Sequence, residues 1–139
     1  MAITQTVCTS FKKELLEGTH DFINHNFKIA LYTSMADLNA DTTAYTADNE
    51  VSGTGYVAND KVLSVVVPSS ADGVGFANFT DATWTSSSFT ARGALIYNSS
   101  AGNKAVMALD FGADKTSNNS TFTVGMPAST STAALIRIT

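Results

Sequence analysis

Alternating apolar and polar residues predict a series of short β-strands. The clearest is Phe89 to Asn98, FTARGALIYN, which is mostly apolar on both faces of an extended segment. Side chains of a strand alternate between its two faces, and a strand that is apolar on both usually lies inside a sheet. We therefore expect this segment to be the central strand. For Arg92, the exception in it, we expect a stem packed on the sheet and a guanidinium that reaches an aspartate or the surface.

Similar patterns predict further strands along the chain. They are FKIALYT (27–33), KVLSVVV (61–67), GVGFANF (73–79), KAVMALDF (104–111), TFTVGMP (121–127) and AALIRIT (133–139). Residues 99–103 have the composition of a hairpin turn, and the polar stretch from Gly112 to Ser120 is expected to be a second turn. From Ser34 to Asn59 the pattern fails, so short turns and one short strand near Tyr56 are expected there.

One segment, Thr9 to Gly18 (TSFKKELLEG), has the pattern of a helix, with Thr9 or Ser10 as its N-cap. A helix of two turns is stable only when packed against a larger element. The apolar side chains expected to make that contact are Phe11, Leu15 and Leu16. We therefore expect an all-β fold: one domain over residues 1–139, built as an antiparallel β-sandwich or jelly roll of seven or eight strands, with a short N-terminal arm and one short helix at about 9–18.

Charge and cysteine content limit the function. The 12 acidic and 8 basic residues give a net charge of −4, and the basic residues are scattered, so nucleic acid is not an expected partner. Cys8 is the single cysteine, which excludes an intrachain disulfide and is expected to be a structural thiol rather than a nucleophile. We see neither a signal-peptide pattern nor an apolar run long enough to span a membrane, so synthesis in the cytoplasm is expected.

An acidic segment partly matches a calcium-binding loop. Asp37, Asn39 and Asp41 occupy the first three ligand positions of such a loop, and Asp48 falls at the twelfth. Thr42 stands where the sharp turn requires glycine, and an aspartate at the twelfth position is too short to bind as glutamate does. We therefore interpret the segment as an Asx-rich surface turn and expect no metal site.

Histidines offer no catalytic or zinc-binding pattern. His20 and His25 are the only two, and no third ligand at a zinc-like spacing accompanies them. The chain also lacks the G-x-S-x-G turn that carries a nucleophilic serine in one large hydrolase class. We expect solvated or capping histidines, no cofactor and no enzymatic activity.

Aromatic residues divide into two groups. Trp84 and Tyr97 lie in strand-like surroundings and are expected in the core. The candidate interface with another subunit or partner lies in the irregular segment and consists of Leu38, Tyr45, Val51 and Tyr56.

Several segments together resemble small β-rich virion structural proteins of tailed bacteriophages. They are FKKELLEGTHDF, FKIALYT, EVSGTGY, FTARGALIYN and AVMALDFG, in this order, within about Phe11 to Ile138. The resemblance implies a non-enzymatic virion protein, with a capsid cement or decoration protein that stabilises the shell as the first expectation. The alternative is a tail or fibre component that includes a receptor- or carbohydrate-binding module.

The resemblance also implies the partners. They are the major capsid protein or other virion proteins, together with further copies of the chain in a homo-oligomer; no membrane contact is expected. The location implied is the virion, assembled from protein made in the bacterial cytoplasm. In such a particle the segment from Ser34 to Asn59, and the residues before the helix, would serve as arms that contact neighbouring subunits.

Overall fold

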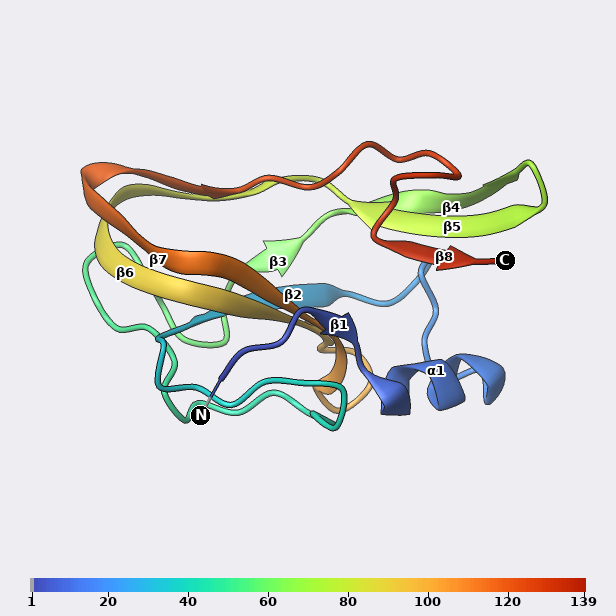
Figure 1. Cartoon of the computed structure of the whole chain (residues 1–139), viewed down its shortest axis with the longest axis horizontal. Helices are drawn as coiled ribbons and strands as arrows, with labels where there is room; N and C mark the ends of the chain where they lie inside the picture. The colour runs from blue at the N-terminus through green and yellow to red at the C-terminus, as the bar shows by residue number, and fades with distance from the viewer. Residues whose placement is uncertain (1) are drawn as a thin grey trace.

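Two antiparallel sheets pack as a sandwich (Figure 1). The computed structural model describes residues 2–139. The larger sheet has the strand order β1-β7-β6-β2-β3 and the smaller one the order β4-β5-β8. The elements are β1 (Thr6–Val7), α1 (Thr9–Leu16), β2 (Phe27–Tyr32), β3 (Val62–Leu63), β4 (Val65–Ala71), β5 (Val74–Phe79), β6 (Ala82–Asn98), β7 (Lys104–Val124) and β8 (Ile136–Ile138). Half of the residues lie in strands and 6% in helix, which confirms the predicted all-β sandwich with one short helix.

Strand β6 is the centre of the larger sheet, as its sequence predicts. Its residues 93–98 pair with β2 on one side and with β7 on the other. Leu95, Ile96 and Tyr97 are fully buried because both faces of the strand are covered. At the edge of this buried run, Arg92 Nε donates a hydrogen bond to Asp110 Oδ1 over 3.3 Å, so the expected aspartate partner is present. Trp84, 3% exposed on the same strand, is in the core with Tyr97 as predicted.

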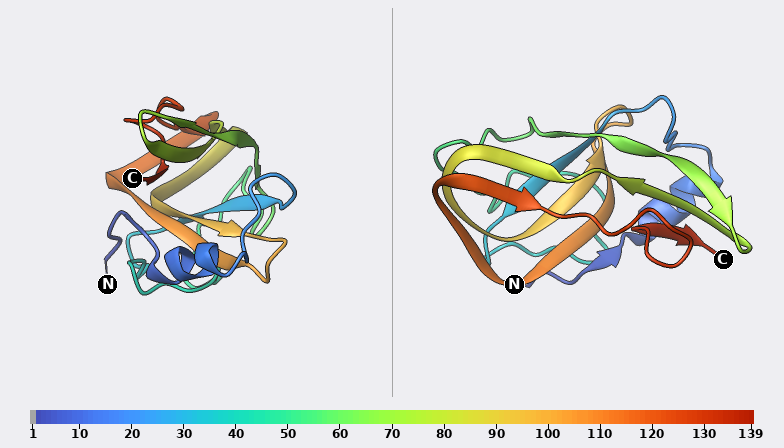
Figure 2. Two further views of the ribbon diagram at one scale, coloured as in Figure 1. Left: turned by 90° about the vertical axis from the view of Figure 1, so that its right-hand side faces the viewer. Right: turned by 90° about the horizontal axis from the view of Figure 1, so that it is seen from above.

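Strand β7 differs from the prediction in an instructive way. The polar stretch from Gly112 to Ser120 is not a turn, because it lies inside β7, which is 21 residues long. The stretch stays paired with β6, at Thr90↔Thr116 and Ser87↔Ser120. The two strands form one ribbon that curves from the larger sheet to the smaller (Figures 1 and 2). Register shifts and backbone with positive φ at Gly112 accompany the bend. Polar residues suit this stretch because its outer surface faces solvent.

Helix α1 is placed as predicted, but it packs through fewer residues. Its N-cap is Cys8, which makes no side-chain capping bond, so the predicted Thr9 or Ser10 cap is wrong. Phe11 is fully buried and Leu15 half-buried, whereas Leu16 is 91% exposed and the prediction for it is wrong. Residues i and i+4 share a helix face, and the next residue turns away from it. Within residues 2–139 no helix is long and apolar enough to cross a membrane.

The irregular segments are built into the chain's own sheets. Strand β1 pairs with β7 at Thr6↔Ala108. Residues 49–51 bond to the outer edge of β2, where Val51 N donates to Leu31 O over 2.9 Å. Near Tyr56 there is an isolated bridge, Thr54↔Ser88, rather than the expected short strand.

Candidate binding groove

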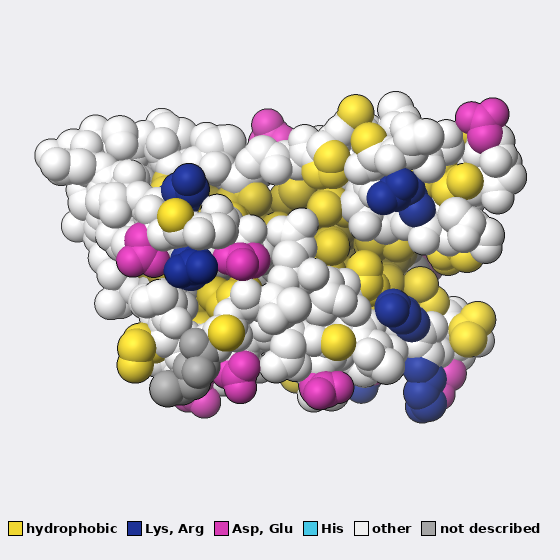
Figure 3. Space-filling view, viewed as in Figure 1, with side chains coloured by type: hydrophobic (Ala, Val, Ile, Leu, Met, Phe, Trp, Pro, Cys, Tyr) yellow, Lys and Arg dark blue, Asp and Glu magenta, His cyan; other side chains and the backbone are white. Residues whose placement is uncertain are grey.

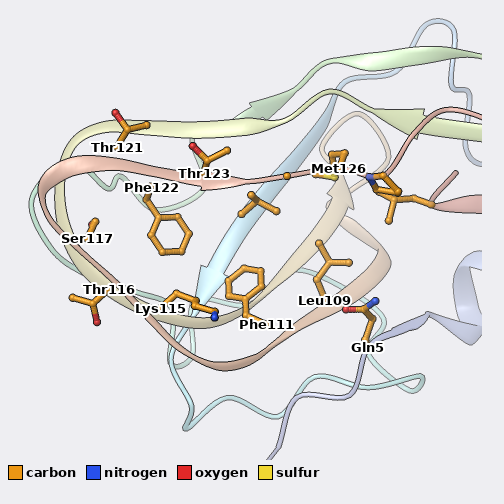
Figure 4. A pocket seen from close by; sticks show the side chains of 14 residues that line it. Gln5, Leu109, Phe111, Lys115, Thr116, Ser117, Thr121, Phe122, Thr123 and Met126 are labelled. Atoms are coloured by element: carbon orange, nitrogen blue, oxygen red, sulfur yellow. The ribbon is translucent and has the colours of Figure 1, made fainter. Parts of the chain in front are cut away.

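An apolar cleft opens between the two arms of the curved β6–β7 ribbon. It has a volume of about 900 Å³ and is visible as a hollow with apolar walls in the space-filling view (Figure 3). Phe111 on one arm and Phe122 on the other point toward each other across it (Figure 4), with ring centroids 6.2 Å apart. Its other apolar wall residues are Leu109, Val124, Met126, Pro127 and Leu135.

The curvature of the ribbon explains why these side chains meet. Phe111 and Phe122 flank the polar stretch of β7, and bending that stretch brings the two apolar ends of the strand face to face. Phe122 is 8% exposed and packs on Phe89 at a centroid distance of 5.0 Å. The inner wall of the cleft is therefore part of the core, and its outer part is left without a covering element.

A second, smaller hollow of about 300 Å³ continues the cleft between α1 and β8. Its apolar walls come from Val7, Phe11, Leu15, Leu16, Ile136 and Ile138. Neighbouring residues of the chain line the two hollows: Gln5 and Leu135 line the first, and Val7 and Ile136 line the second. We call them together the seam groove, since they follow the open side of the sandwich where the two sheets come apart. Figure 3 shows apolar atoms along this course.

The charged residues of the seam groove are all basic. They are Lys12, Lys115 and Arg137, and no carboxylate of the part of the chain that the structure describes lines either hollow. None of the three has a carboxylate oxygen within 4.0 Å among the described residues. Arg137 donates instead to the backbone oxygen of Thr132 over 2.7 Å. In a chain of net charge −4, the groove is thus locally cationic.

Unpaired strand edges border the groove. Within the described range 2–139, residues 111–124 of β7 pair with no strand except β6, and β8 pairs only with β5. These edges offer backbone N–H and C=O groups to an additional strand. The free edge of β4 is different, because Pro68 and a register shift next to it make it a poor template for pairing.

The residues predicted to form an interface lie elsewhere and do not make an exposed patch. Leu38 and Val51 are 1% and 4% exposed, so they are core residues and offer almost no surface to a partner. Tyr45 and Tyr56 are half-buried, and both hydroxyls donate to the carboxylate of Glu50 over 2.5 Å. Burial, followed by the Glu50 hydrogen bond, raises the pKa of both phenols. A partner contact through the exposed parts of the two tyrosines stays a prediction.

The histidines form a structural network with Asn98. The buried Asn98 amide nitrogen donates to Nδ1 of His20 and to Nδ1 of His25, each over 3.0 Å. With Nδ1 accepting, Nε2 of His20 carries the proton and donates to Glu14 Oε1 over 2.8 Å. His20 is 8% exposed and packs on the ring of Phe11, so the expectation of a solvated or capping histidine is wrong for it. Its polar groups are fully used in holding α1 to the hairpin end of β6.

The remaining candidate groups have structural surroundings. Asn39 Oδ1 accepts from the backbone N–H of Asp41 over 2.8 Å, which is the Asx-turn geometry expected there. Within residues 2–139 no three His, Cys, Asp or Glu side chains are placed to hold a metal ion. Cys8 is fully buried, and burial, with a smaller effect of Glu14, raises the pKa of its thiol to about 11. This environment suppresses the thiolate that a nucleophile needs.

Comparison with known proteins adds no relative. No protein-family model, no curated protein and no solved structure matches the chain.

Proposed function

We propose that the protein is a non-enzymatic structural component of a tailed-bacteriophage virion, acting as a cement or decoration protein on the capsid. The observation that supports this function best is the seam groove. It leaves apolar side chains such as Leu16 and Ile138 exposed, at 91% and 61%, beside two unpaired strand edges. Exposed apolar side chains beside an apolar hollow are typical of a site of contact with another macromolecule. The sequence resemblance to small virion proteins supplies the class of assembly.

The chemistry of the groove supports a binding role over a catalytic one. Its charged side chains are three cations, and its lining contains no histidine, cysteine or carboxylate that would act as a general base. The histidines, Cys8 and Glu50 are held in the structural contacts described above. In this proposal, burial of the apolar walls against a capsid protein supplies the binding free energy, and the rigid sandwich links neighbouring capsid subunits.

A second candidate function has an observation of its own. The rings of Phe111 and Phe122 face the cleft, and its volume of about 900 Å³ is in the range of small-molecule sites. Aromatic rings are suited to stacking on the apolar face of a sugar ring. This favours, as the alternative, a tail or fibre component with a carbohydrate- or receptor-binding role.

A co-sedimentation assay with capsid shells that lack the protein tests the proposal. We expect saturable binding that raises the thermal stability of the shells. Leu16→Ser should weaken binding, because it removes an exposed apolar side chain of the groove. Val67→Ser is the matched control, since Val67 is 68% exposed on β4 outside the groove and its variant should bind normally. Absence of shell binding, with binding to tails or to host glycans, would favour the alternative.

A further inference from the structure

The shape of the seam groove fits an extended chain. Its two hollows follow one another from the bend of the ribbon, past Leu135 and Ile136, to α1, and Figure 3 shows apolar atoms along this course. A compact ligand would fill one hollow only, whereas an extended segment can lie along both. The unpaired edges of β7 and β8 border this course and present backbone N–H and C=O groups at the regular spacing of a strand. Another extended peptide can pair with such a row of groups, whereas an alkyl chain or a sugar ring cannot.

The positive charge of the groove indicates a negatively charged partner. Acidic residues outnumber basic ones by 12 to 8 in the chain, yet among residues 2–139 the charged side chains that line the groove are Lys12, Lys115 and Arg137. By contrast, Arg92 and Lys13 form ion pairs with carboxylates of the chain itself. Cations without carboxylate partners around an apolar trough are complementary to acidic side chains.

The apolar side chains of the groove fit aliphatic side chains of a partner. Leu16 turns away from the core-facing side of α1, and Ile138 extends from the last strand into the same hollow. In Figure 4, Phe111, Phe122 and Lys115 converge on the larger hollow, so an apolar wall and a cation lie side by side there as well. In an extended peptide, alternate side chains point to opposite sides, so one set can enter the hollows while the other reaches the basic rim.

We propose that the seam groove binds an extended segment of a partner protein in which aliphatic residues alternate with Asp or Glu, added as a strand along the edge of β7 or β8. The inference rests on the proposed function, because it names the kind of segment that a partner virion protein presents to this chain. The apolar walls supply affinity, and the three cations select acidic segments over basic ones.

Fluorescence anisotropy with a short labelled peptide of alternating Glu and Val tests the inference. The matched control peptide carries Lys in place of each Glu. We expect saturable binding of the acidic peptide alone, with an affinity that falls as salt is added. Lys115→Glu should weaken binding about tenfold or more, since it reverses a charge at the groove. Lys104→Glu is the control variant, because Lys104 is exposed at the hairpin end of β7 and lines neither hollow.

Several outcomes would overturn the inference. Equal binding of the acidic and basic peptides, or equal loss in the Lys115→Glu and Lys104→Glu variants, would show that the groove does not select by charge. Sedimentation as an oligomer that Leu16→Ser converts to a monomer would make a second copy of the chain the occupant. Shell binding without peptide binding would reject this inference and leave the proposed function standing. Peptide binding without shell binding would support the groove's chemistry and reject the capsid function.

Discussion

High pH should destabilise this protein through its tyrosines. The four tyrosines are Tyr32, Tyr45, Tyr56 and Tyr97. Burial is the largest cause that raises the pKa of each phenol, and the negative charge of Glu50 raises it further. Each hydroxyl also donates a hydrogen bond within the fold, as Tyr97 Oη does to Asn59 Oδ1 over 2.5 Å.

The size of the effect follows from proton linkage. In the unfolded chain a tyrosine ionises near pH 10, whereas in the fold its raised pKa keeps it protonated. The contribution of each tyrosine to stability is therefore fully present below about pH 10 and is lost as the pH rises toward the folded pKa. At about pH 11 the loss is roughly 1.4 kcal/mol for each fully protected tyrosine. Tyr32 and Tyr97 are fully buried and together account for about 3 kcal/mol, a large share of a typical folding free energy of about 5 to 15 kcal/mol.

Urea unfolding followed by the fluorescence of Trp84 at a series of alkaline pH values measures this loss. We expect the free energy of unfolding to begin to fall near pH 9, where Cys8 of the unfolded chain ionises, and to fall steeply above about pH 10, where the tyrosines of the unfolded chain ionise. Tyr97→Phe should be slightly less stable at neutral pH because it loses the hydrogen bond to Asn59 Oδ1, but its stability should fall less steeply between about pH 10 and 11. Tyrosinate absorbance that rises near pH 10 in the folded protein, with no change in stability, would refute the reasoning.

Three further predictions concern the interior. Gly93→Ala should lower the free energy of unfolding by about 1 to 3 kcal/mol, because the added Cβ would lie 2.5 Å from the carbonyl oxygen of Leu109. Gly75→Ala is the control, since a Cβ added at Gly75 would have no atom within 4 Å. Equal losses for the two variants in urea unfolding would contradict the prediction. Asn98→Ala should lower the free energy of unfolding by about 1 to 3 kcal/mol, since Nδ1 of the buried His20 loses its donor while Nδ1 of the half-buried His25 keeps the backbone N–H of Asp21; a loss below about 0.5 kcal/mol would argue against the network. Cys8 should react with thiol reagents only when the protein unfolds, so labelling should accelerate in urea; rapid labelling of the native protein would exclude the buried thiol.

Sequence reasoning identifies the elements whose burial follows a simple period. Residues 89–98 are apolar on both faces, and they form the interior part of β6. The same reasoning fails where a strand is paired but uncovered. The polar stretch of β7 resembles a turn because periodicity reports burial rather than backbone pairing, and nothing local reveals that β6 continues alongside it.

The seam groove could not be predicted for a related reason. Leu16 looks like a core residue of a short amphipathic helix, and only the tertiary structure shows that no element covers it. The predicted interface residues Leu38 and Val51 are buried because the irregular segment packs on the edge of β2, a contact between segments far apart along the chain. The sequence holds one weak indication of the groove, because the polar stretch of β7 is flanked by two apolar aromatic residues, Phe111 and Phe122. Their rings meet when the strand bends.

Image reconstruction of capsid shells, alone and after addition of the purified protein, tests the central claim most directly. The account predicts added density at regular lattice positions, with the seam groove, marked by Leu16, Phe111 and Ile138, turned toward the capsid protein. Shells without added density, or density in which the groove faces solvent, would contradict the account.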